Sequence, residues 1–250
     1  MHLPFVTWDH LLLLALLASA VLEWRSLYPR FVRAAALGVP GARLRYYAFQ
    51  IAILWVQAAW VVALWIALGR PWAALLLGSS PLWRLAIGWA LAGVYIWLAL
   101  SQRRALLAKP SRLARFMQSI GSAEALVPRT SGERRAFVAV SITAGITEEL
   151  LFRGFVLWYA SQWAGPVGGF LVSSAIFGMM HVYLGVRHVP RTAIAGAFFY
   201  AVAMSAGSLL PAMLSHAVAD LVSGDIGFRA LTAGDAAADA EPSAPAPAAK

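Results

Sequence analysis

The feature that most constrains the fold is a series of seven apolar stretches, each long enough or nearly long enough to cross a bilayer. A spanning helix needs about 20 mainly apolar residues. Hydrophobic residues make up 61% of the chain and charged residues only 12%, too few charges to cover so much apolar surface in water. We therefore expect an all-α, polytopic membrane helix bundle of about seven transmembrane helices. The stretches are 8–22, 47–69, 84–101, 136–160, 166–185, 190–206 and 208–223.

The first of these stretches has two interpretations, a retained helix or a cleaved signal peptide. Its leucine-rich run ends in Ala18-Ser19-Ala20, which has the small residues of a cleavage site. However, no Lys or Arg precedes the run, and Asp9 and His10 stand at its start. We therefore expect a retained helix.

The distribution of basic residues predicts the orientation in the membrane. Alternate loops carry fifteen Lys and Arg residues, whereas the loops between them carry only Arg70 and Arg84. Loops rich in Lys and Arg stay in the cytoplasm. We expect an integral protein of the inner (cell) membrane with its N-terminus outside and its C-terminus cytoplasmic. The same pattern assigns the net charge of +9 to contacts with the lipid bilayer, so nucleic acid is not an expected partner.

Three regions follow one another along the chain. Residues 1–135 hold the N-terminal transmembrane helices and a basic cytoplasmic loop, in which residues 113–120 have the apolar spacing of a short helix lying on the membrane or against the bundle. Residues 136–224 form a core of helices with polar side chains. Residues 225–250 are rich in Ala and Pro, which predicts a disordered tail.

The fourth stretch contains charges that need a partner or a function. A charged residue at the centre of a spanning helix costs about 2.5–3.5 kcal/mol on the insertion scale. Glu149 and Arg153 are four residues apart with the acid first, the favourable order for an ion pair within a helix. Glu148 points about 100° around the helix from Glu149 and has no such partner. An unpaired carboxyl group away from water can exchange protons as a general base; the alternative is helix packing through polar contacts.

The fifth and seventh stretches add His181 and the pair His216 and Asp220. A single histidine among apolar residues is more often a core residue, but Asp220 lies four residues after His216 and can orient its ring or keep it protonated. Three polar helices in succession favour one buried pocket. Such a pocket can activate a water and stabilise an oxyanion, bind a divalent metal, or conduct protons. The chain has no Cys, no His-Glu-x-x-His helix and no Gly-x-Ser-x-Gly elbow, which excludes thiol, zincin and serine-hydrolase chemistry of those types.

Taken together, the polar residues form three motifs on successive apolar helices. In chain order they are Glu148-Glu149-x-x-x-Arg153, Phe177-x-x-x-His181 and His216-x-x-x-Asp220. This combination resembles the CPBP family, which comprises CAAX-processing endoproteases and bacteriocin-processing or self-immunity proteins. The family is also called the Abi family of glutamic-type intramembrane proteases. The resemblance covers about residues 136–224.

The resemblance implies a role for each motif residue. Glu148 corresponds to the general base that activates the attacking water, and His181 to the second residue that holds this water. Glu149 and Arg153 correspond to the ion pair that supports the site. The family was first described as metalloproteases, whereas a water activated by Glu needs no metal. No cofactor is therefore expected, and a divalent metal such as zinc stays an open alternative.

His216 and Asp220 correspond to the pair thought to stabilise the tetrahedral oxyanion. Members of the family often have Asn at the position of Asp220. An ionised Asp would repel an oxyanion, so Asp220 either is protonated or only orients His216.

We expect an intramembrane endopeptidase, a hydrolase that cleaves a peptide bond near the C-terminus, leader or membrane anchor of a membrane-associated protein or peptide substrate. Prenylated CAAX tails are the eukaryotic substrates of the family, and the Ala- and Arg-rich composition of this chain favours a leader or a C-terminal sorting anchor. The alternative is a non-enzymatic membrane scaffold or immunity protein. A proton-coupled transporter is a third hypothesis, but the polar residues occur only in the C-terminal half, without paired half-repeats.

Overall fold

The computed structural model describes residues 4–240, and side chains from 4 to 232. Every regular element in this part of the chain is helical, as the apolar stretches predict. The α-helices are α1 (Thr7–Leu22), α2 (Tyr28–Ala36), α3 (Ala42–Ala67), α4 (Leu82–Leu107), α5 (Pro110–Ile120), α6 (Ser131–Glu148), α7 (Leu157–Met180), α8 (His188–Ala206) and α9 (Leu210–Ala240). Shorter elements are the π-helical η1 (Glu23–Leu27) and η4 (Glu149–Val156) and the 3₁₀-helical η2 (Trp72–Leu75), η3 (Gly121–Leu126) and η5 (Val182–Leu184).

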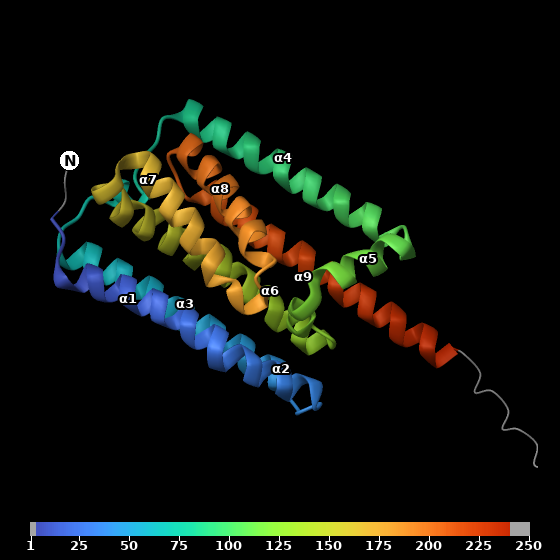
Figure 1. Cartoon of the computed structure of the whole chain (residues 1–250). Helices are drawn as coiled ribbons and strands as arrows, with labels where there is room; N and C mark the ends of the chain where they lie inside the picture. Colours follow the sequence, from blue (N-terminus) through green and yellow to red (C-terminus); the bar gives the residue numbers. More distant parts are fainter. Residues whose placement is uncertain (1–3, 241–250) are drawn as a thin grey trace, which may run out of the picture.

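The long helices lie side by side in one bundle. In Figure 1, α4 runs along one edge and α1 with α3 along the opposite edge, while α6, α7, α8 and α9 lie between them. Within residues 4–240, five helical segments are long and apolar enough to cross a membrane. They are Thr7–Ala36, Ala42–Ala67, Leu82–Leu107, Ser131–Met180 and His188–Ala206.

The longest of these segments holds two of the expected spans. Ser131–Met180 has 50 residues, which as a straight helix would measure about 75 Å, more than twice the hydrocarbon thickness of about 30 Å. The chain instead turns at Gly165, whose φ of 68° and ψ of 178° are not helical. Glycine tolerates this positive φ. Pro166 then lies in the first turn of the next helical segment, where its lack of an N–H breaks no helical hydrogen bond.

The seventh expected span corresponds to the first part of α9. This helix contacts α4, α6 and α8, and also α5. It is not among the five most apolar segments, because it carries polar side chains such as His216 and Asp220. Polar residues within membrane helices normally face the interior of a bundle, and the contacts of α9 agree with that placement.

The N-terminal helix is longer than the sequence predicts. It continues from α1 through η1 and α2 to Ala36, so the arginines expected in the first loop lie on a helix. Pro29 has no N–H to donate to the carbonyl one turn earlier, which accounts for the π-helical widening at η1. At the other end of this helix, buried Asp9 accepts two hydrogen bonds of 2.7 Å from Arg70. The charge of Asp9 is therefore paired within the protein.

The C-terminal end also differs from the expectation. Residues 225–240, which the sequence analysis assigns to a disordered tail, continue α9 in the structure. Alanine has the highest helix propensity, and the segment is rich in it. In addition, Asp225 binds arginines of α4 and α6 and so fastens α9 beyond the expected span. The remainder of the predicted tail, residues 241–250, lies outside the described residues.

The short helix predicted within the basic loop is present as α5. Its apolar residues Leu113, Phe116, Met117 and Ile120 are half-buried, and the helix contacts α4 and α9. Packing against the bundle is therefore the better of the two interpretations of this amphipathic segment.

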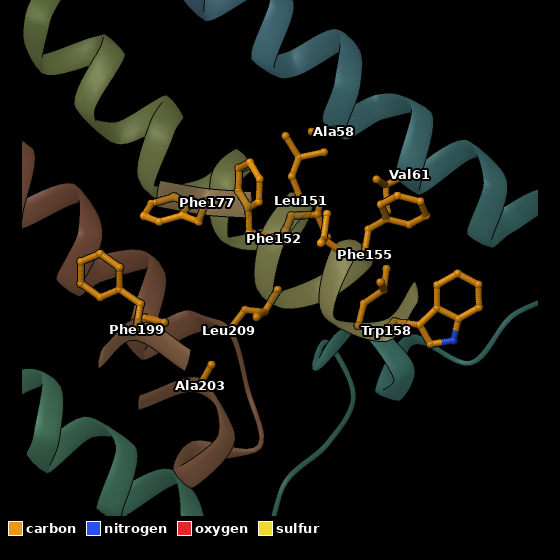
Figure 2. Packing of buried hydrophobic residues seen from close by; sticks show 14 of the residues in the cluster. Ala58, Val61, Leu151, Phe152, Phe155, Trp158, Phe177, Phe199, Ala203 and Leu209 are labelled. Carbon is orange, nitrogen blue, oxygen red and sulfur yellow. The ribbon is translucent and has the colours of Figure 1, made fainter. Parts of the chain in front are cut away.

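The centre of the bundle is organised around η4, in which all eight residues are buried. Figure 2 shows Leu151 and Phe155 of η4 on the side of α3, which contributes Ala58 and Val61. On the other side, the ring of Phe152 contacts an aromatic ring of α7 at 5.1 Å between centroids. This packing holds the motif of the fourth apolar stretch, Glu148-Glu149-x-x-x-Arg153, at the centre of the fold.

Candidate active site

The site forms where α6 and α9 approach closely. A side chain at Gly145 would place its Cβ 2.7 Å from both the Ala217 Cβ and the Met213 carbonyl oxygen. These distances are shorter than any normal contact, so the two helices can meet here only because position 145 has no side chain. Glu148 follows Gly145 by three residues, and His216 lies between Met213 and Ala217. The close approach therefore brings the motifs of the fourth and seventh stretches together.

Glu149 is the central hydrogen-bond acceptor of the site. Its Oε1 accepts hydrogen bonds from Arg153 Nη1 and from His216 Nδ1, each at 2.9 Å. The side chains of Glu149 and Arg153 are 0% and 2% exposed, so the pair is fully enclosed. The ion pair predicted from the i, i+4 spacing is therefore present, and it also holds the histidine of α9.

The imidazole of His216 has distinct surroundings at its two nitrogens. Because Nδ1 donates to Glu149, the opposite nitrogen, Nε2, is directed to Glu148 Oε2 at 4.0 Å and to Asp220 Oδ2 at 3.9 Å. Both distances are too long for a direct hydrogen bond and suit a bridging water or substrate atom. Glu149 makes the hydrogen bond to Nδ1, and Asp220 faces the opposite nitrogen, so an orienting or charge-stabilising role of Asp220 stays a prediction.

Two phenylalanines enclose the charged groups. Phe199 of α8 stacks on the His216 ring with centroids 4.9 Å apart and an interplanar angle of 14°, and Phe177 meets the same ring edge-on at 5.8 Å. The Arg153 guanidinium lies 4.0 Å above the Phe177 ring. These contacts fix the arginine and the imidazole and keep water from the ion pair. Sequence reasoning missed Phe199, because an aromatic residue in an apolar helix looks like any other core residue.

His181 lies at the C-terminal end of α7, next to this cluster. Its Nδ1 donates a hydrogen bond of 2.8 Å to the Phe177 carbonyl oxygen, which leaves Nε2 free as an acceptor in the neutral ring. Its ring contacts the Phe177 ring at 5.0 Å, and it interacts electrostatically with His216 and Asp220. Among residues 4–232, no hydrogen bond or ion pair joins His181 directly to Glu148.

The exposure of the side chains shows where the site opens. Glu149 is 0% exposed, His216 7%, Glu148 15% and Asp220 39%. The site therefore runs from an enclosed ion pair to a mouth at Asp220. Glu148 Oε2 is buried without a hydrogen-bond partner among the described residues, so it can bind a water or a substrate group there.

A metal site was an open alternative for these residues. In the part of the chain that the structure describes, no three His, Asp or Glu side chains are grouped so that they could hold a metal ion. Both Glu149 and His216 Nδ1 are engaged with one another, which removes donors from such a set.

Comparisons with known proteins agree with this organisation. Residues 131–222 match the family model described as type II CAAX prenyl endopeptidase Rce1-like. No curated protein and no solved structure matches the chain. The matched segment begins at the first residue of α6 and contains all the site residues named above. The match confirms the resemblance to the CPBP family and supports intramembrane protease activity in this segment, which is similar to the Rce1-like CAAX prenyl endopeptidases.

Proposed function

We propose that this protein is an intramembrane endopeptidase in which Glu148 activates the attacking water. The observation that carries the proposal is the division of roles between the two neighbouring carboxylates. Glu149 is engaged through Oε1 by Arg153 and His216, although its Oε2 has no hydrogen-bond partner among the described residues. Glu148 Oε2 is likewise buried without such a partner, and it lies 4.0 Å from His216 Nε2. A free carboxylate beside an oriented imidazole is the arrangement that general-base catalysis requires.

The proposed reaction begins with a water held between Glu148 and His181. Glu148 takes a proton from the water as its oxygen attacks the peptide carbonyl carbon. The carbonyl oxygen gains the negative charge and accepts a hydrogen bond from His216 Nε2, because the Glu149 carboxylate favours the doubly protonated ring. Glu148 then returns its proton to the leaving amine, and the C–N bond breaks.

Asp220 acts on His216 in this proposal. Its carboxylate lies 3.9 Å from His216 Nε2 and favours the imidazolium form, without donating to the oxyanion itself. The reaction uses no metal or other cofactor.

We propose as substrate a membrane-associated protein or peptide cleaved near its C-terminus, leader or membrane anchor. Prenylated CAAX tails are candidate substrates, because the matching family is described as CAAX prenyl endopeptidases. The proposed location is the inner (cell) membrane, with the N-terminus outside and the C-terminus cytoplasmic, as the distribution of Lys and Arg favours. Nucleic acid is not a proposed partner.

The experiment compares wild type with Glu148→Gln in liposomes, using a library of quenched fluorescent peptides, both farnesylated and unmodified. Glu124→Gln is the matched control, because Glu124 of η3 is 43% exposed and pairs with Arg129, away from the site. We expect Glu148→Gln to fold and insert normally and to lose about 10²–10⁴-fold in rate, the usual value of a general base. Near wild-type cleavage by Glu148→Gln would refute the mechanism, and a wild type that cleaves no peptide would favour the scaffold hypothesis.

A further inference from the structure

A second buried polar cluster lies beside the candidate site. Glu23 accepts a hydrogen bond from the Tyr46 hydroxyl, and Gln50 Nε2 donates to the same hydroxyl at 2.8 Å. Glu23 is 8% exposed and begins the π-helix η1. π-Helical stretches are rare and occur frequently at functional sites. The other one in residues 4–240, η4, begins with Glu149 of the candidate site.

Tyr183 of η5 lies between this cluster and the candidate site. Its ring meets the Tyr28 ring edge-on at 4.9 Å and stacks along His181 with centroids 6.1 Å apart at 24°. Tyr183 also packs against the buried aromatic cluster that contains Tyr28 and Tyr46. Its ring therefore adjoins His181 of the site as well as the cluster that holds the partner of Glu23.

The backbone on either side of Tyr183 is fixed. Ser122 Oγ donates a hydrogen bond of 2.5 Å to the Leu184 carbonyl oxygen, and the Tyr28 hydroxyl donates to the Ser122 carbonyl at 2.6 Å. These bonds connect η5 to η3 and to the first helix. Tyr183 is thus held in a defined position, as a catalytic group must be.

The state of the Tyr183 hydroxyl suits a donor. A tyrosine hydroxyl has an ordinary pKa of about 10, so it is protonated and can donate at neutral pH. An ionised Asp220, by contrast, can only accept hydrogen bonds. Tyr183 thus provides, beside His181, a hydrogen-bond donor of a kind that an ionised Asp220 cannot supply.

We propose that the Tyr183 hydroxyl, together with His216, is a catalytic hydrogen-bond donor to the oxygen of the tetrahedral intermediate. This inference rests on the proposed endopeptidase function. The phenol stabilises the oxyanion by a hydrogen bond, and no proton leaves it. The aromatic cluster that includes Tyr28 and Tyr46 packs against Tyr183 and supports its position.

The first experiment compares Tyr183→Phe with wild type in liposomes, on the peptide of the quenched library that wild type cleaves fastest. Loss of one oxyanion donor lowers kcat by roughly 10²–10³-fold, and we expect KM and the unfolding temperature to stay near wild type. Tyr47→Phe is the matched control, because this buried tyrosine donates to the Leu126 carbonyl oxygen in the same aromatic cluster, away from the acids of the site. It should retain wild-type kcat.

The second experiment tests the chemistry of the donor with two unnatural residues at position 183. 4-Aminophenylalanine keeps an N–H donor in place of the hydroxyl, whereas 4-methylphenylalanine fills the same space without donating. We expect the kcat of the 4-aminophenylalanine variant to be at least about tenfold higher than that of the 4-methylphenylalanine variant.

The outcomes separate this inference from the function on which it rests. An active Glu148→Gln, or a wild type that cleaves no library peptide, refutes the proposed function and this inference with it. An inactive Glu148→Gln together with wild-type kcat in Tyr183→Phe overturns only the role of Tyr183. Equal kcat values for the 4-aminophenylalanine and 4-methylphenylalanine variants also overturn that role.

Discussion

Arg153→Ala provides the sharpest test of how the site is held together. The guanidinium donates to Glu149 at 2.9 Å, lies 4.0 Å above the Phe177 ring and is 2% exposed. Its removal leaves the Glu149 carboxylate enclosed and bound only to His216, and it opens a cavity between α7 and α8. Removing one partner of a buried ion pair costs about 3–5 kcal/mol.

This free energy predicts a large change in thermal stability. For a chain of this size, 1 kcal/mol corresponds to roughly 2–4 °C in the unfolding temperature, so we expect a decrease of roughly 6–20 °C. The assay is thermal unfolding of purified protein in detergent, with activity measured on the folded fraction. Folded yield should fall in parallel.

A surface pair of the same chemistry is the control. Arg129 lies 3.2 Å from Glu124, and both side chains are more than two-fifths exposed. Exposed pairs contribute about 0–1 kcal/mol, so Arg129→Ala should change the unfolding temperature little. Wild-type stability of Arg153→Ala, or equal effects of the two substitutions, would refute the argument that the buried pair holds the site.

Three further predictions concern other parts of the bundle. Gly145→Ala should reduce both stability and peptidase activity, measured by thermal unfolding and peptide cleavage, because its Cβ would force α6 away from α9; wild-type values of both would contradict the close approach. Burial alone would raise the pKa of Asp225. The hydrogen bonds from Arg103 and Arg229 outweigh the effect of burial, so the pKa of Asp225 is lowered. Its stabilising effect should therefore be complete above the ordinary pKa of 3.8 and be lost as pH falls through the lowered value. Asp225→Asn should remove this part of the acid dependence of stability in detergent, and an unchanged pH profile would contradict it. Reporter fusions within 102–135 should report the cytoplasm, since this loop is rich in arginine, and an external signal would refute the topology.

Much of the fold could be predicted from the chain alone, because it depends on local regularities. The length and apolar character of the stretches predict membrane helices, whatever their partners are. The spacing of Glu149 and Arg153 places both side chains on one helix face, so their ion pair is a local property. The same spacing directs Glu148 elsewhere and distinguishes the two carboxylates before any packing is known.

Only the tertiary structure decided which side chains meet across helices. The bond from His216 to Glu149 joins residues 67 positions apart, and it depends on the close approach of α6 and α9 at Gly145. The stacking of Phe199 on His216 likewise depends on how α8 packs, and the sequence pattern of an apolar helix contains no sign of it. Spacing along a helix determines which residues share a face, whereas the shapes of all the contacting side chains determine which faces meet.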